Sequence, residues 1–315
     1  MVVTAKMNGN HINMDLQQLR YVVEVAALSS FTRAAERCFV TQSALSHQIA
    51  ALERELGQRL FVRSSRSVRL TEAGEAFVVP ARAALLAAAQ AKEDAAAVVG
   101  DVVGTLRFGV IPTVTAVDVP ALLVAYRSAH PSARVELKVG NSDALMADIR
   151  RGDLDVALLG LREDVRPAAI ASRLLASERL VVVVPPAHAL ADAASVGIRD
   201  LSGMTFADFP AGTSGRAQSD AAFAAADVDR DVAFEADSAE LILGLVEAGL
   251  AVTLLAPGVV ARSKADVVTL DLQRGPVRNE YVAWDAAAPR SVARALLAVL
   301  EGEGTGAFFS AVNAS

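Results

Sequence analysis

The sequence predicts an α/β protein with three successive parts. The first is a small, mainly helical N-terminal domain in which short helices are followed by a basic, strand-like turn. The second is one long, alanine-rich helical pattern, and the third is a larger region in which strand-like and helix-like runs alternate. The chain has 315 residues, of which 53% are hydrophobic, which suffices for more than one packed core.

These patterns divide the chain at positions where the type of periodicity changes. We expect an N-terminal tail at residues 1–13, a winged helix-turn-helix at 14–70, a linker helix at 71–99, a hinge at 100–104 and a two-lobed α/β domain at 105–315. Within the last domain we place lobe I at 105–161 and 278–315, and lobe II at 167–267.

The helix-turn-helix is predicted from capping residues and from the polarity of one helix. Ser30 can cap a short helix over Phe31–Arg37, and Thr41 can cap a longer one over Gln42–Leu56. Gly57 suits the left-handed residue that ends such a helix. The N-terminal face of the second helix is polar and uncharged, which is typical of a recognition helix that reads base edges.

The charge distribution favours a DNA-binding N-terminal domain, although the net charge is −6. Residues 54–70 contain five arginines against one glutamate, so a basic module belongs to an otherwise acidic chain. Two strand-like pieces there flank a serine turn, as in a β-wing with cations facing the phosphate backbone. The alternative is an ordinary solvated basic loop.

The long helix carries an apolar stripe that one helix cannot bury alone. Its alanines allow a second helix to approach closely, so we expect pairing with the same helix of another protomer. The alternative is docking onto the chain's own domains. The candidate dimer residues are Phe77, Ala81, Leu85 and Ala88.

Residues 105–315 contain a weak internal repeat. Val135–Leu137 and Val232–Phe234 are each followed by a serine, a helical run, a glycine and an apolar strand. Two similar α/β lobes imply a cleft between them, where strand ends meet helix N-termini.

The combined pattern resembles the LysR-type transcriptional regulators. The resemblance is tight over residues 14–74, where the matching stretches include Ser30–Ala35, Thr41–Ser46, Ile49–Glu53 and Leu70–Gly74, and looser beyond them. Ser43 stands where many relatives have proline, and either residue suits the first turn of a helix. The resemblance implies a regulatory domain of periplasmic-binding-protein type, a homodimer or tetramer, and double-stranded DNA with an interrupted palindrome. It also implies contact with RNA polymerase.

Candidate binding residues follow from side-chain chemistry and from this resemblance. Glutamine can pair bidentately with adenine, and arginine can position the protein on phosphates. The candidate DNA-binding residues are Thr32, Arg33, Gln42, Ser43, Ser46, His47, Arg54, Arg63 and Arg66. The resemblance points to Thr113, Asn141, Ser142, Gly212, Thr213 and Ser214 as effector-binding residues, which suit a carboxylate or another small polar ligand. For Ser142 and Ser214 the alternative is a helix cap.

Other classes of function are disfavoured by the sequence. The four histidines have no metal-ligand spacing, and the segment 212–216 lacks the final glycine of a nucleophile elbow, so we expect no enzyme, metal or cofactor. Cys38 is the single cysteine; a redox-responsive regulator acting through it is an alternative, but a structural thiol is favoured. A solute-binding protein is the other alternative. We expect a cytoplasmic protein without a membrane span, because residues 1–13 lack the apolar region of a signal peptide.

Overall fold

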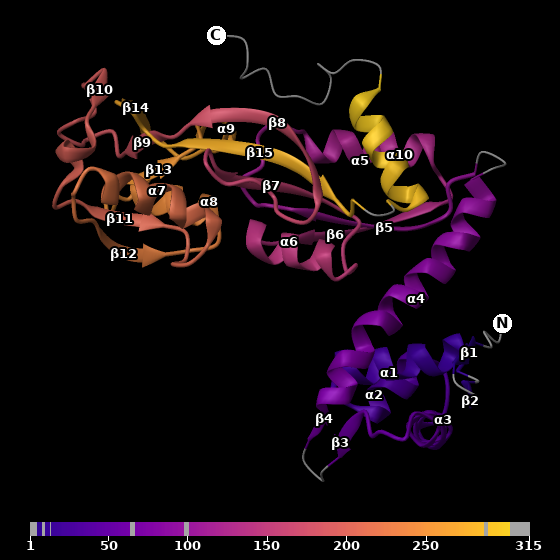
Figure 1. Ribbon diagram of the computed structural model, residues 1–315. Helices are drawn as coiled ribbons and strands as arrows, with labels where there is room; N and C mark the ends of the chain where they lie inside the picture. Colours follow the sequence, from indigo (N-terminus) through magenta and orange to yellow (C-terminus); the bar gives the residue numbers. More distant parts are fainter. Residues whose placement is uncertain are drawn as a thin grey trace. The chain divides into compact units, whose positions relative to one another are not determined.

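The computed structural model describes residues 5–7, 10–12, 14–63, 67–97, 101–286 and 289–302 (Figure 1). The chain forms two compact units, residues 1–95 and 96–315. Within the described residues, no helix is both long enough and apolar enough to cross a membrane.

The first unit contains a three-helix core with the expected caps. Its helices are α1 (Leu16–Leu28), α2 (Phe31–Arg37) and α3 (Gln42–Leu56). Ser30 and Thr41 accept hydrogen bonds at the starts of α2 and α3, and Gly57 ends α3 with a φ of 66°. These local signals explain why the predicted bounds of α2 and α3 coincide with the observed ones.

The turn between α2 and α3 contains a residue in an unfavourable conformation. Phe39 has a φ of 56°, a left-handed value that favours glycine or asparagine, and its side chain is 93% exposed. The backbone N–H of Val40 donates to the carbonyl of Ala35, which closes the end of α2. Because Cys38 and Val40 pack against the hydrophobic core on either side, Phe39 is left facing solvent.

The remaining elements of this unit include the strands of the predicted wing. Strand β3 (Phe61–Arg63) pairs antiparallel with β4 (Val68–Leu70), and α4 (Glu72–Ala97) is the predicted linker helix. In the N-terminal segment, β1 (Ala5–Met7) pairs antiparallel with β2 (Asn10–Ile12).

Lobe I of the second unit is built on a mixed five-stranded sheet with the order β6-β5-β7-β15-β8. Its strands are β5 (Gly104–Val110), β6 (Ala133–Val139), β7 (Val156–Arg162), β8 (Ala171–Arg179) and β15 (Val277–Trp284). Helices α5 (Val119–Ala129) and α10 (Ser291–Glu301) contribute to one hydrophobic core, and α6 (Ser142–Arg150) contributes to another. Leu158 and Leu159 belong to different cores, because successive strand residues point to opposite faces.

Lobe II contains a four-stranded sheet and a two-stranded sheet. The first has the order β10-β14-β9-β13, and the second pairs β11 with β12 in parallel. The strands are β9 (Val181–Val184), β10 (Ser195–Val196), β11 (Thr205–Asp208), β12 (Asp231–Glu235), β13 (Thr253–Leu255) and β14 (Val268–Leu272). The helices are η1 (Ile198–Leu201), α7 (Ser214–Ala225), α8 (Ala239–Glu247) and α9 (Pro257–Arg262).

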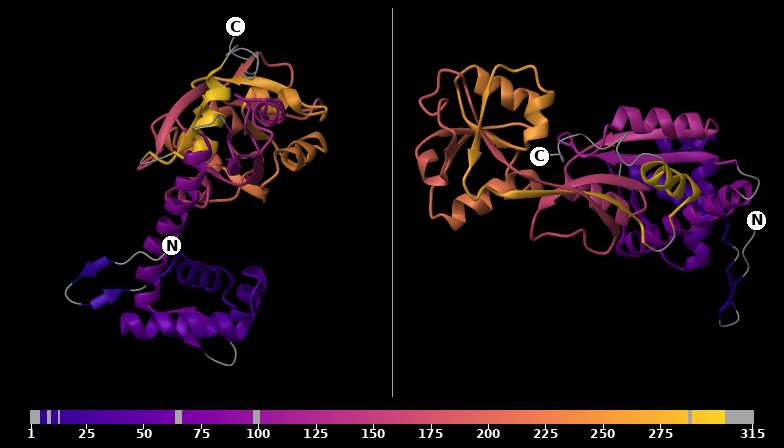
Figure 2. Two further views of the ribbon diagram at one scale, coloured as in Figure 1. Left: turned by 90° about the vertical axis from the view of Figure 1, so that its right-hand side faces the viewer. Right: turned by 90° about the horizontal axis from the view of Figure 1, so that it is seen from above.

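The first crossing between the lobes comes later in the chain than the sequence suggested, whereas the return crossing lies between residues 267 and 278, as expected. We expected lobe II to begin at residue 167, but β8 pairs with β15 in the sheet of lobe I. The crossings therefore lie where β8 is followed by β9 and where β14 is followed by β15, near residues 180 and 276 (Figure 2). The pairing of β8 with a strand about a hundred residues away is non-local, so no pattern within residues 161–180 reveals it.

Candidate functional site

The start of α3 presents a polar face to solvent. Gln42, Ser43 and His47 are exposed, and Ser46 is half-buried. The cap at Thr41 holds this end of the helix, because its hydroxyl accepts from the N–H of Ala44 at 3.2 Å. The residues predicted to read bases therefore lie on a defined, accessible helix end.

The structure describes only some of the residues that are predicted to contact the phosphate backbone of DNA. Thr32 and Arg33 are exposed at the start of α2, and Arg33 also donates to the carbonyl of Leu28. Arg54 is exposed near the end of α3, where its Nε donates to the carbonyl of Ala50 at 3.3 Å. The side chain of Arg63 and all of Arg66 lie outside the described residues.

Cys38 has the surroundings of a structural thiol. It is half-buried and packs against the core of the first unit. Burial, and secondarily the charge of Glu24, raises the pKa of the Cys38 thiol. A raised pKa lowers the fraction of thiolate, which is the reactive form, so the geometry disfavours a redox role.

The predicted dimer stripe is partly used within a single chain. Phe77 packs against the core of the helix-turn-helix, and Ala81 is buried. Leu85 and Ala88 are half-buried. The more C-terminal part of the stripe is therefore the better candidate for contact with a second chain.

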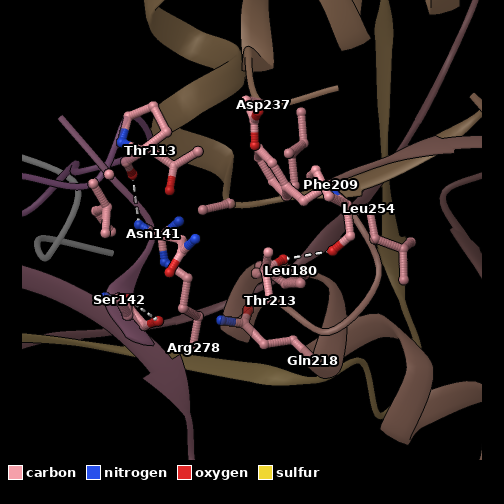
Figure 3. Close-up of a pocket in the computed structure, with 18 of the residues that line it drawn as sticks. Thr113, Asn141, Ser142, Leu180, Phe209, Thr213, Gln218, Asp237, Leu254 and Arg278 are labelled. Carbon is pink, nitrogen blue, oxygen red and sulfur yellow. Dashed lines mark hydrogen bonds between the residues drawn. The ribbon is translucent and has the colours of Figure 1, made fainter. Parts of the chain in front are cut away.

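A cavity of about 330 Å³ lies between the two lobes of the second unit (Figure 3). Lobe I supplies the end of β5, the start of α6 and part of β15. Lobe II supplies the loop that precedes α7 and the end of β13. Four of the six predicted effector residues line the cavity, namely Thr113, Asn141, Ser142 and Thr213.

The lobe I residues differ in how much hydrogen-bonding capacity they retain. Asn141, rather than Ser142, caps α6, since its Oδ1 accepts from the N–H of Ala144 at 2.9 Å. The Ser142 hydroxyl is used within the lobe, because it donates to the carbonyl of Gly160 at 2.9 Å and accepts from the Gly160 N–H at 3.0 Å. The Thr113 side chain and the Asn141 amide NH₂ make no hydrogen bond within the described residues, so both can bind a ligand.

The lobe II residues predicted from the sequence act mainly as structural groups. Thr213 caps α7 and donates from its hydroxyl to the carbonyl of Pro210 at 2.8 Å. Gly212 and Ser214 line a neighbouring depression rather than this cavity. Ser214 forms a contact between the lobes: its N–H and hydroxyl donate to Oδ2 of Asp143 on α6, at 2.9 and 2.7 Å.

A buried arginine that was not predicted from the sequence enters the cavity from β15. Arg278 is 5% exposed, and its Nη2 donates to Glu280 and to the carbonyl of Thr113, the latter at 2.7 Å. Its Nε is buried and has no hydrogen-bond partner among the described residues. Burial lowers the pKa of Arg278 to about 10, so the guanidinium is still cationic at neutral pH.

Glu280 forms an ion pair with this arginine inside lobe I. It is 1% exposed and accepts from the N–H groups of Thr115 and Ala116 at 2.9–3.1 Å. Alternation along β15 places Arg278 and Glu280 on one face of the strand. That spacing of two charges in an otherwise uncharged strand is the sequence signal that could have revealed the site.

Gln218 and an apolar set complete the lining. Gln218 on α7 is 3% exposed, and its amide makes no hydrogen bond within the described part of the chain. The apolar lining residues are Ile111, Val139, Leu180, Phe209, Leu254, Leu255 and Ala256. Because such residues also form ordinary cores, nothing in the sequence distinguishes them as cavity residues.

Two family models together match most of the chain. Residues 16–75 match the bacterial regulatory helix-turn-helix of the lysR family, and residues 100–304 match the LysR substrate binding domain. The protein belongs to the LysR family of transcription regulators. It is thus a DNA-binding regulator with an effector-binding domain, as the sequence predicted.

Individual LysR relatives agree with this assignment. The chain is 36% identical to the Hca operon transcriptional activator HcaR of Escherichia coli over 78% of this chain and 82% of the relative. It is 33% identical to the transcriptional dual regulator GltC of Bacillus subtilis, over 77% and 80% of the two chains.

Solved structures of LysR regulators confirm the fold. A full-length variant of OxyR from Pseudomonas aeruginosa is 27% identical and gives a TM-score of 0.69, covering 91% of this chain and 95% of the other. Full-length CbnR in complex with its target DNA is 25% identical and gives a TM-score of 0.62, covering 91% and 99%.

Proposed function

We propose that the protein binds an interrupted palindrome in double-stranded DNA and that a small polar or anionic effector in the interlobe cavity controls this binding. Recognition rests on α3, whose exposed Gln42, Ser43 and His47 would lie in the major groove. The observation that carries the DNA part is this uncharged polar helix end within a matched LysR helix-turn-helix.

The effector part is carried by the cavity between the lobes. Thr113 and Asn141 offer unused polar groups there, and the N-terminus of α6 favours negative charge. A ligand that touches both lobes has a different affinity for each relative arrangement of the lobes. Binding of the ligand therefore changes which arrangement of the lobes is most populated, and this change would alter the placement of the paired DNA-binding domains.

Assembly would follow from the linker helix α4. We propose that α4 pairs with the same helix of a second protomer, so that two recognition helices address the two half-sites, and that dimers can pair into a tetramer. Action on transcription would take place in the cytoplasm, in contact with RNA polymerase. We expect no enzymatic activity.

A gel-shift and footprinting experiment tests the DNA part. The probe is the DNA upstream of the protein's own gene, and the variants are Gln42→Ala and the control Gln58→Ala, an exposed residue just beyond α3. Gln42→Ala should relax the preference at one base pair, with a cost of about 1–3 kcal/mol. Unchanged affinity and preference in Gln42→Ala would show that α3 does not read the site.

Calorimetry tests the effector part. A ligand found by thermal-shift screening should bind Thr113→Val more weakly than wild type, because the variant loses a hydroxyl but keeps the shape. DNA binding without ligand should be unchanged. Equal affinity for wild type, Thr113→Val and Asn141→Ala would place the effector site elsewhere.

A further inference from the structure

Helix α9 of lobe II touches lobe I at the loop that follows β5. Arg262, the last residue of α9, donates from its Nη1 to the carbonyl of Val114 at 2.6 Å and from its Nη2 to the carbonyl of Thr115 at 2.9 Å. Because the guanidinium is planar, two donors on two successive carbonyls fix the orientation of the contact as well as its position. The lobes are thus joined here as well as between Asp143 and Ser214.

The packing at the other end of α9 is too close for any side chain. Gly258 is buried in the first turn of α9, and a Cβ there would be 2.8 Å from Cγ2 and 2.9 Å from Cβ of Thr115. Its φ is not left-handed, so the close approach is what requires glycine at this position. Leu255 and Ala256, which directly precede α9, line the cavity between the lobes. Helix α9 therefore connects the lobe II part of the cavity wall with the lobe I loop.

The same loop holds the buried ion pair of lobe I. The N–H groups of Thr115 and Ala116 donate to the Glu280 carboxylate at 2.9–3.1 Å. The carbonyl of Thr113 accepts from Arg278 at 2.7 Å, and both of these residues line the cavity. The loop thus carries Arg262 on its carbonyls and the ion pair on its N–H groups.

Thr115 is also in contact with both strands at which the chain crosses between the lobes. Its hydroxyl oxygen lies 2.7 Å from a carboxylate oxygen of Glu178 on β8 and 2.7 Å from one of Glu280 on β15. Glu178 shortly precedes the first crossing, and Glu280 shortly follows the return crossing. A rotation of the lobes about these crossings therefore acts on the surroundings of Thr115.

We propose that α9 transmits the angle between the lobes to this loop, so that separation of the lobes loosens the hydrogen bonds that hold Glu280 and thereby the position of Arg278. Buried charges must keep their partners, so the ion pair follows the loop. Arg262 does not line the cavity and acts as a positioning residue. This inference rests on the proposed effector cavity and specifies how its wall is coupled to the lobe angle. By reciprocity, a ligand that fixes the wall biases the angle.

Hydrogen–deuterium exchange of the full-length protein, without DNA or ligand, tests the contact. Arg262→Gln removes the charged donors, and Gly258→Ala forces α9 away from the loop. Because Arg262 is exposed and water competes with it, each variant should speed exchange in a peptide covering 111–118 by about fivefold. The controls are Arg199→Gln, which removes a donor to the carbonyl of Ala226 inside lobe II, and Gly244→Ala, whose Cβ would meet nothing within 4 Å. Exchange at the wild-type rate in both test variants would refute the contact.

A variant at the other interlobe contact separates transmission from local support. Asp143→Ala breaks the bonds to Ser214 and leaves the contact of α9 with Thr115 unaltered in sequence. If the lobe angle is transmitted, exchange in the peptide 111–118 should also rise in Asp143→Ala, and it should stay unchanged in Glu136→Ala, which removes an exposed carboxylate of lobe I. Exchange in Asp143→Ala at the wild-type rate would reduce Arg262 to a local support and overturn the proposal.

Failure of this inference is distinguishable from failure of the proposed function, because neither DNA nor an effector enters the experiment. If exchange responds as expected but no ligand binds the cavity, the coupling through α9 stands and the effector part of the proposed function falls. If a ligand binds in a Thr113-dependent way and alters DNA binding while exchange does not respond, only the coupling through α9 is wrong.

Discussion

The hydrogen bonds between Asp143 and Ser214 join the two lobes directly, so their removal should favour separation of the lobes. Asp143 lies in the first turn of α6 in lobe I, and Ser214 begins α7 in lobe II. Two donors of Ser214 share the single oxygen Oδ2 of Asp143. Asp143→Ala removes both interactions and leaves the Asn141 cap of α6 in place.

The free energy that these two hydrogen bonds contribute to holding the lobes together follows from the charge and exposure of Asp143 and Ser214. Hydrogen bonds to charged groups contribute about 1.5–3 kcal/mol each when they are sheltered. Asp143 is exposed, so water competes for its oxygens, and we expect about 1–2 kcal/mol for the two bonds together. That free energy shifts the ratio of closed to open lobes by about 5–30-fold toward open.

Distance measurement between spin labels on the two lobes would show the shift. Leu137 on β6 and Leu241 on α8 are both exposed and can be replaced by cysteine in a Cys38→Ser background. Asp143→Ala should add a population at longer distance. Glu136→Ala is the matched control, since it removes an exposed carboxylate that pairs with Arg134 inside lobe I. Identical distance distributions in the Asp143 variant and the control would refute the reasoning.

Four further predictions concern the DNA-binding unit, the linker helix and lobe II. Arg66→Ala should weaken binding to all DNA sequences alike and reduce the salt slope by about one, as measured by titration at several salt concentrations; a changed sequence preference would contradict a backbone role. Leu85→Glu should lower the mass measured by light scattering, because it puts a charge in a helix seam; an unchanged mass in a folded variant would contradict pairing through α4. Phe39→Asn should raise the melting temperature, since it relieves about 1 kcal/mol of left-handed strain, and a lower melting temperature would contradict the strain argument. Arg230→Met should cost about 3–5 kcal/mol in urea unfolding, because it leaves the Asp208 carboxylate buried without its partner at 2.6 Å. Burial raises the pKa of Asp208 and the charge of Arg230 opposes that rise, so in Arg230→Met the pKa of Asp208 should rise further. The stability deficit of Arg230→Met should therefore shrink as the pH falls from 7.5 toward 5, because the unpaired carboxylate takes up a proton in the fold; an equal deficit at both pH values would contradict this.

The predictable parts of the fold are those specified by neighbouring residues. Ser30, Thr41 and Gly57 determine where α2 and α3 begin or end, because capping interactions span only a few positions. The LysR assignment was likewise predictable, since residues 16–75 carry many fixed spacings.

The parts that could not be predicted depend on long-range pairing. The expected bounds of lobe II, 167–267, include the segment 171–179, yet this segment pairs with β15 in the sheet of lobe I. Arg278 was missed for the same reason: its position beside Thr113 and Gly160 exists only after β15 has paired with β7. Ser214 was correctly noticed as a polar residue at a helix start, but its partner Asp143 is set by how the lobes face each other.

The neighbouring strands β8 and β15 have a mechanical consequence for the regulator. Both crossings between the lobes leave from one edge of the same sheet, and they are tied together where the N–H of Leu180 donates to the carbonyl of Pro276 at 2.9 Å. Two chain crossings held side by side resist twisting and shearing of the lobes more than they resist bending about the line that joins them. We therefore expect bending about the line that joins the two crossings to be the easiest motion between the lobes, and a ligand in the cavity to act mainly on that bending angle. Effectors of different shape would then set different bending angles between the lobes, and would not produce different kinds of movement.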